Sequence, residues 1–216
     1  MNSLKLKVCG MRDPGNIREV AELKPDYLGL IFFEKSPRHV NEVIPETNAS
    51  IKKTGVFVDA SADYILKRQQ EYKLSAIQLH GNESPQFCRE LKNSLPKNVE
   101  LIKVFSVGED FDFSELEPYE GVVDFFLFDT KGKNKGGNGI SFDWEILKKY
   151  PSTVPFFLSG GIGPEGVSEI KELHQFFEQQ NKQGIFYGVD VNSRFETEPA
   201  LKDAKKLKIF RESLLS

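Results

Sequence analysis

The sequence predicts an α/β fold of the (β/α)8 TIM-barrel class, formed by a single domain over residues 1–216. Short apolar segments alternate with longer amphipathic segments along the whole chain. The apolar segments end at intervals of roughly 21 to 31 residues, the length of one βα unit. Eight such units fit a closed barrel better than an open sheet, and no low-complexity linker divides them.

The eight predicted strands are rich in Val, Ile, Leu and Phe and are too short for free-standing helices. Their continuous apolar character is typical of parallel strands that helices cover from outside. The ranges are 4–9, 27–33, 54–59, 76–80, 100–106, 124–129, 155–159 and 186–190.

The segments between the strands carry helix signals. Residues 62–72 place Ile65 and Leu66 among charged side chains, as expected of a helix with one buried face. Ser84 is expected to cap a second helix, with Pro85 at its first position. Helices are also predicted over 142–150, 164–177 and 202–215, with a brief one in 110–119 and no clear pattern in 41–53.

Composition excludes several classes of function. The net charge is -3 and the basic residues are spread along the chain, which disfavours a nucleic-acid platform or a membrane-binding patch but allows small anionic ligands. No apolar run approaches the ~20 residues that span a bilayer, and the start of the chain lacks a signal-peptide core. Cys9 and Cys88 have no metal-type spacing and are expected to be reduced thiols in a cytoplasmic protein.

In such barrels the functional residues lie at the C-terminal ends of strands and in the loops that follow. Cys9 ends the first predicted strand, and Gly10 lets the chain turn at once. The thiol can fill the top of the barrel as a small apolar group, or act as a thiolate base or nucleophile.

Arg38 lies in the polar loop after the second strand. Its side chain can form a two-pronged contact to a carboxylate or phosphate, or lie solvated at the surface.

The fourth and sixth strands also end in polar residues. His80 has no second histidine or carboxylate at metal-ligand spacing, so we expect a hydrogen-bonded structural residue and no metal site. Asp129 follows four apolar residues and can either cap its loop or act as a general acid. The loop after it contains Gly136 and Gly137, which could lie against a ligand, fold over it, or simply be flexible.

The last two strand ends predict a phosphate site. Loops after the seventh and eighth strands of such barrels often bind phosphate together with a short helix N-terminus. Gly160 and Gly161 lack the Cβ atoms that would block an anion, and Ser193 offers a hydroxyl donor. Asp190 and Asn192 belong to the same candidate binding loop.

Taken together, these segments resemble the phosphoribosylanthranilate isomerase family over nearly the whole chain. The motifs that carry the resemblance are 7–10, 36–38, 55–58, 78–83, Asp129 with 136–139, 142–144, 159–162 and 188–193. Gly166, Arg194 and Asn138 depart from the family pattern, which usually has Asn, Gly and Thr there. Arg194 is expected to point outward into solvent.

The resemblance implies an Amadori rearrangement of N-(5-phosphoribosyl)anthranilate by a monomer that uses no cofactor. It implies that Asp129 is the general acid at the ribose ring oxygen and Cys9 the general base at C2. It further implies that Arg38 holds the anthranilate carboxylate and that the last two strand-end loops hold the phosphate.

Three alternatives stay open. Indole-glycerol-phosphate synthase uses strand-end lysines and a glutamate, and here Lys103 is the only internal strand lysine of that kind. A metal-dependent sugar-phosphate epimerase needs a His and carboxylate ligand set that is not evident. A non-catalytic barrel that binds a sugar phosphate would have no need for both Cys9 and Asp129.

Overall fold

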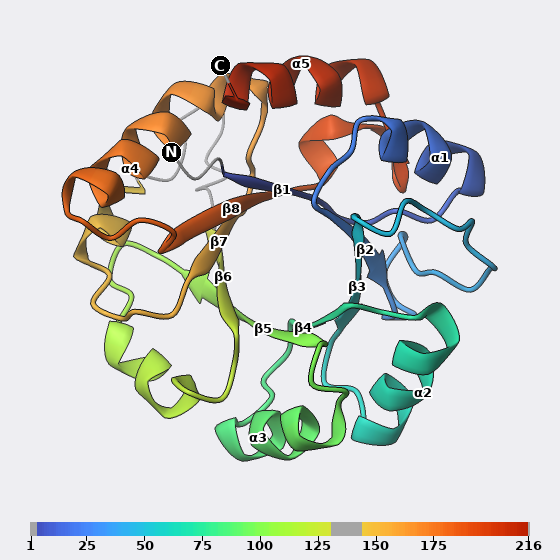
Figure 1. Ribbon diagram of the computed structural model, residues 1–216, viewed down its shortest axis with the longest axis horizontal. Helices are drawn as coiled ribbons and strands as arrows, with labels where there is room; N and C mark the ends of the chain where they lie inside the picture. Colours follow the sequence, from blue (N-terminus) through green and yellow to red (C-terminus); the bar gives the residue numbers. More distant parts are fainter. Residues whose placement is uncertain (1–3, 131–143, 216) are drawn as a thin grey trace.

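The computed structural model describes residues 4–130 and 144–215, which form a closed barrel of eight parallel strands (Figure 1). The strands follow chain order around the ring, and β8 closes it by pairing with β1. The predicted fold class is therefore confirmed, and the predicted strand ends differ from the observed ones by about two residues or less. The strands are β1 Lys5–Val8, β2 Tyr27–Ile31, β3 Lys52–Phe57, β4 Ala76–Leu79, β5 Glu100–Val107, β6 Phe125–Thr130, β7 Phe156–Ser159 and β8 Phe186–Val191.

Helices lie outside the ring of strands (Figure 1). Ser84 caps α3 as predicted, with its Oγ accepting from the backbone N of Phe87 at 3.2 Å. The first helix was not predicted, although Asp13 caps it and Pro14 begins it, which are recognisable start signals. The α-helices are α1 Pro14–Glu22, α2 Ala62–Tyr72, α3 Pro85–Ser94, α4 Val167–Gln179 and α5 Ala204–Leu215.

Four segments differ from the predicted helices. In the described part of 142–150, residues Trp144–Lys149 form the 3-10 helix η2, and Phe113–Tyr119 likewise forms the 3-10 helix η1. The predicted helix over 164–177 begins with a 3-10 turn, η3 Pro164–Gly166, before α4. The prediction for 202–215 began too early, because Lys202 belongs to a small strand rather than to α5.

That small strand belongs to an antiparallel pair inserted between β8 and α5. The strands β9 Glu196–Glu198 and β10 Leu201–Lys202 follow a short 3-10 helix, η4 Ser193–Phe195. Cα pairing sets Lys202 opposite Glu196. The pair places both charged side chains beside the C-terminal end of β8, next to the barrel mouth.

The barrel interior is filled below the mouth. One buried cluster lies between the strands and the helices, and a second consists of Tyr27, Ala76, Ile102, Val104, Phe125, Leu127 and Phe157. The rings of Tyr27 and Phe157 meet edge to face with centroids 5.3 Å apart. The second cluster packs the inside of the barrel, so it forms a floor beneath the strand ends.

Both cysteines are buried and free of disulfides. Within residues 4–130 and 144–215, no helix combines the length and the apolar character needed to cross a membrane.

Candidate active site

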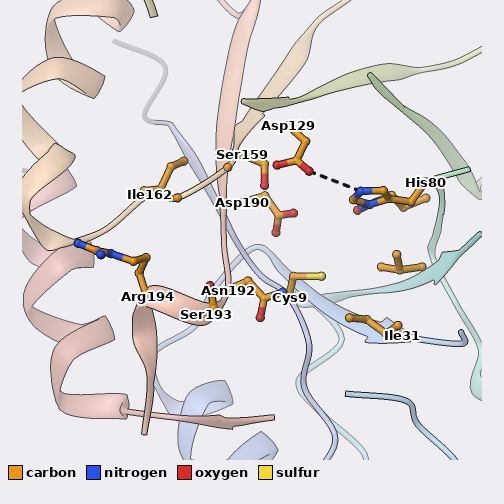
Figure 2. A pocket seen from close by; sticks show the side chains of 14 residues that line it. Cys9, Ile31, His80, Asp129, Ser159, Ile162, Asp190, Asn192, Ser193 and Arg194 are labelled. Atoms are coloured by element: carbon orange, nitrogen blue, oxygen red, sulfur yellow. Dashed lines mark hydrogen bonds and ion pairs between the residues drawn. The ribbon is translucent and has the colours of Figure 1, made fainter. Parts of the chain in front are cut away.

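A pocket of about 210 Å³ opens at the C-terminal ends of the strands (Figure 2). It contains seven of the residues predicted for the site, and Arg38 lies outside its lining. Gly136 and Gly137, also predicted for the site, lie outside the described residues. The lining consists of Cys9, Ile31, Val56, Gln78, His80, Asp129, Ser159, Gly160, Gly161, Ile162, Asp190, Asn192, Ser193 and Arg194.

Cys9 directly follows β1, and its backbone N donates to the carbonyl of Val191 at 2.9 Å. Figure 2 shows its sulfur directed into the pocket. The neighbouring strand makes room for it at Gly29, where an added Cβ would lie 2.8 Å from Sγ and 2.9 Å from Cα of Cys9. The position of the thiol therefore depends on Gly29, a residue that no sequence pattern singles out.

The electrostatic setting of Cys9 combines burial with nearby charges. Burial raises the pKa of the Cys9 thiol above its ordinary value, because water no longer solvates the thiolate. The Lys7 and Lys202 ammonium groups act in the opposite direction, whereas the Asp190 carboxylate adds to the rise. The resting thiol therefore keeps its proton at neutral pH, with two cations placed to favour its ionised form.

Asp129 and His80 are neighbours in the pocket lining. The Asp129 carboxylate is 32% exposed, with Oδ2 3.6 Å from Nε2 of His80 (Figure 2). Nε2 of Gln78 lies 3.1 Å from Nδ1 of His80, so this contact holds the ring with its Nε2 toward Asp129. The apolar run before Asp129 suggested a buried carboxylate, but its side chain is directed into an open pocket. A group in this position can reach a ligand there.

Arg38 lies beside the pocket and is held by a protein carboxylate. Its Nε donates to Oε1 of Glu196 at 2.8 Å and its Nη2 to Oε2 at 2.6 Å. Glu196 also binds Nζ of Lys202 at 2.5 Å. The arginine passes over Gly10, whose φ is +77° and whose Cβ, if present, would lie 2.6 Å from Cδ of Arg38. Glu196 therefore takes two of the guanidinium donors that were predicted to hold a ligand.

The loops after β7 and β8 have the backbone expected of an anion site. Gly160 and Gly161 adopt φ values of 94° and 67°, in the region that side-chain-bearing residues rarely occupy. Ser193 begins the short helix η4, beside Gly160 and Gly161 in the pocket lining. Asn192, in contrast, uses its Oδ1 to accept from Nζ of Lys202 at 2.8 Å.

Arg194 lies at the outer edge of these loops. Its side chain is 55% exposed and pairs with Glu165, so it bridges the loop after β8 to η3. Figure 2 shows it extending away from Cys9 and Asp129. This agrees with the expected outward orientation, although the residue also belongs to the pocket lining.

Several residues of the site were not found by sequence reasoning. His80 was interpreted as structural but lines the pocket, while Lys7, Lys202 and Glu196 received no role at all. His80 follows β4 at the barrel mouth, so the strand-end rule could have promoted it. In the described part of the chain, no group of three or more His, Cys, Asp or Glu side chains could hold a metal ion.

Lys103, which bears on one alternative, does not line the pocket. Its neighbours Ile102 and Val104 belong to the cluster inside the barrel, so Lys103 points to the opposite face of the strand. Its Nζ lies 3.2 Å from Oε2 of Glu83 and donates to the carbonyl of Gly81 at 2.8 Å. Lys103 is thus directed away from the pocket.

Comparison with known proteins gives a consistent answer. The family model of N-(5'-phosphoribosyl)anthranilate isomerase matches residues 6–213. The isomerase of that name from Parabacteroides distasonis is 44% identical, covering 97% of this chain and 93% of the relative, and the one from Phocaeicola vulgatus is 43% identical, covering 97% of each. The crystal structure of the Thermotoga maritima enzyme is 27% identical, with a TM-score of 0.78 over 98% of each chain. The chain belongs to the N-(5'-phosphoribosyl)anthranilate isomerase family.

Proposed function

We propose that this protein isomerises N-(5-phosphoribosyl)anthranilate to 1-(2-carboxyphenylamino)-1-deoxyribulose 5-phosphate in tryptophan biosynthesis, with Asp129 as general acid and Cys9 as general base. The observation that carries the assignment of roles is the pocket, into which both side chains extend (Figure 2). β7 and β8 separate β6 from β1 around the ring, so a substrate in the pocket can have one group on each side. Family membership supports the reaction itself.

The first step opens the ribose ring. Asp129 gives its proton to the ring oxygen as the bond from that oxygen to C1 breaks, and the nitrogen lone pair forms the iminium. The exposed side of the carboxyl group allows this contact, and Nε2 of His80 lies 3.6 Å from Oδ2 of the same group. General acid catalysis of this kind contributes typically ~10²–10⁴-fold.

The second step moves a proton from carbon. The Cys9 thiolate takes the proton from C2, and the electrons of that C–H bond neutralise the iminium to give an enolamine. Tautomerisation of the enolamine yields the ketone. The electrons stay within the substrate, from C2 to C1, so the reaction balances without an external oxidant or reductant.

The two ends of the substrate are anionic and would fix its orientation. The loops after β7 and β8 would receive the phosphate near Gly160, Gly161 and Ser193. Arg38 would receive the anthranilate carboxylate through Nη1, since Glu196 engages Nε and Nη2. The role of Gly136 and Gly137 in substrate binding stays a prediction. The monomeric state and the cytoplasmic location also stay predictions.

The test is an assay of the purified protein on phosphoribosylanthranilate, whose fluorescence should fall on turnover. A folded wild-type protein that does not consume the compound would contradict the proposal. Product binding in the absence of turnover would favour the non-catalytic barrel. Calorimetry on the same preparation measures that binding, with reduced 1-(2-carboxyphenylamino)-1-deoxyribulose 5-phosphate as a product analogue.

Replacing Arg38 with alanine should raise KM at least about tenfold and change kcat less, because a charged contact that is equal in ground and transition states contributes mainly to binding. Arg18→Ala, on the exposed face of α1, is the matched control and should leave both constants unchanged. Steady-state kinetics measure the effect. An unaltered KM in Arg38→Ala would remove this arginine from the substrate site.

A further inference from the structure

A buried ion pair lies directly beneath the proposed base. Lys7 and Asp190 occupy paired positions on β1 and β8, and Nζ of Lys7 is 2.9 Å from Oδ1 of Asp190. The two side chains are 0% and 5% exposed. Lys7 and Cys9 are two residues apart along the same strand direction, so both face the barrel interior.

Such a pair is not explained by stability. Taking two charges out of water is costly, and well-packed apolar residues in the same place are often as stabilising or more so. Although the two groups are close, neither Nζ of Lys7 nor Oδ1 of Asp190 completes a hydrogen bond to any described residue. The ammonium group therefore retains donors that are free to act on a neighbouring charge.

The charged groups around Cys9 favour a negative sulfur. They come from β1, from the loop after β2, from β8 and from the β9–β10 pair, and three are cations while two are anions. The groups are Lys7, Arg38, Lys202, Asp190 and Glu196. The cations of this set outnumber its anions, which favours a thiolate, and Asp129 and His80 line the same pocket from β6 and from the end of β4.

The other two cations are already engaged. Lys202 is held by Glu196 and Asn192, and Arg38 is held by Glu196. Lys7 has Asp190 as its counter-ion and Cys9 as a second neighbour. Burial lowers the pKa of Lys7, but the Asp190 carboxylate and the Cys9 sulfur outweigh it and raise that pKa, so Lys7 stays protonated. A permanent buried positive charge thus lies next to the thiol.

We propose that Lys7 is a positioning residue whose ammonium group stabilises the Cys9 thiolate, and that Asp190 weakens this effect as the counter-ion of Lys7. The proposal rests on the proposed role of Cys9 as base. Lys7 itself keeps its proton throughout. The thiol proton leaves to solvent through the pocket before substrate binds, and the sulfur later takes the C2 proton. Asp190, which lines the pocket, would then tune the base in addition to any contact with substrate (Figure 2).

The test measures the ionisation of Cys9 without substrate. The rate of Cys9 alkylation by iodoacetamide is followed against pH by mass spectrometry of its peptide, which gives the titration midpoint. Lys7→Met should move the midpoint to higher pH, with about tenfold less thiolate at a given pH. Asp190→Asn should move it to lower pH, because the charge that opposes the thiolate is lost.

Opposite shifts separate this role from a structural one, since mere damage to the barrel would not give opposite signs. Lys103→Met removes another buried, ion-paired lysine that points away from the pocket, and it should leave the Cys9 midpoint unchanged. If Lys7→Met does not fold, as removal of one partner of a buried pair can cause, Asp190→Asn alone still tests the sign. Equal midpoints in wild type and Asp190→Asn, or a shift to higher pH, would overturn the proposal.

Kinetics distinguish failure of this inference from failure of the proposed function. If the inference holds, the pH profile of kcat/KM shifts together with the Cys9 midpoint in each folded variant. A midpoint that moves while the profile stays in place would mean that Cys9 is not the base. An unmoved midpoint, together with an inactive Cys9→Ser variant, would retain Cys9 as base and reject Lys7 as its support.

Discussion

The variant Cys9→Ser is expected to lower kcat about 10²–10⁴-fold while leaving product binding within a few-fold of wild type. A serine hydroxyl is far harder to ionise than a thiol. The nearby cations therefore cannot convert it into a base comparable to the thiolate. Its smaller side chain fits the space that Gly29 leaves, so the pocket keeps its shape. Stopped-flow or steady-state kinetics, with calorimetry for binding, measure the two effects.

Cys88→Ser is the matched control for this variant. Cys88 is also a buried free thiol, but it lies in α3 and outside the pocket lining. We expect unchanged kcat, with some loss of stability because a hydroxyl replaces a buried sulfur. An undiminished kcat in Cys9→Ser would exclude Cys9 as the base.

The same residue sets an expected pH dependence. The pKa of Cys9 is raised above its ordinary value, and the active form of a base is the deprotonated one. The fraction of thiolate therefore grows as the pH rises from neutral, and this contribution raises kcat/KM toward alkaline pH, whereas the need for a protonated Asp129 acts in the opposite direction. The contribution of the thiolate should be absent from the residual activity of Cys9→Ser.

The second large effect is expected for Asp129→Asn. An amide has the shape of the carboxyl group but cannot serve as a proton donor at the ring oxygen, so kcat should fall about 10²–10⁴-fold with product still bound. The side chain is 32% exposed, with His80 at 3.6 Å, so we expect the melting temperature to change little. Kinetics and thermal denaturation, measured together, separate loss of the acid from loss of the fold.

Asp124→Asn provides the matched control for that substitution. Asp124 immediately precedes β6, at the opposite end of the strand from Asp129, and accepts hydrogen bonds from Lys92 and from the backbone N of Leu101. Losing these contacts should reduce stability without changing kcat. If Asp129→Asn retained wild-type kcat, or lost activity only in proportion to folded protein, Asp129 would not be the acid.

Local patterns were sufficient for most of the barrel. Short runs rich in apolar residues located all eight strands, because strands covered on both faces are mostly apolar, although β1 also carries Lys5 and Lys7. Ser84 and Pro85 located the start of α3 for an equally local reason. The 3-10 segments and the β9–β10 pair were not foreseen, since their shapes depend on what they pack against rather than on a period in the sequence.

The residues of the candidate site could be located from local patterns, but the contacts between them could not. Cys9 and Asp129 were found because a polar residue after an apolar strand reaches the barrel mouth whatever its neighbours are. His80 obeys the same rule, but a lone histidine gives no sign of its partner, and only the fold brings Asp129 to 3.6 Å. Arg38 was expected to hold a ligand, and the fold adds that Glu196 already holds the arginine.

The sequence by itself determined the barrel and its strand ends, because periodicity is a local property, and it placed Cys9 and Asp129 at two of those ends. The roles proposed for them in proton transfer came from the family resemblance. Only the tertiary structure decided the electrostatic setting of Cys9. The charges that act on the thiol come from Lys7, Asp190 and Lys202, and the latter two are distant in sequence. Electrostatic energy depends on distance and burial, so the order of residues along the chain does not reveal it.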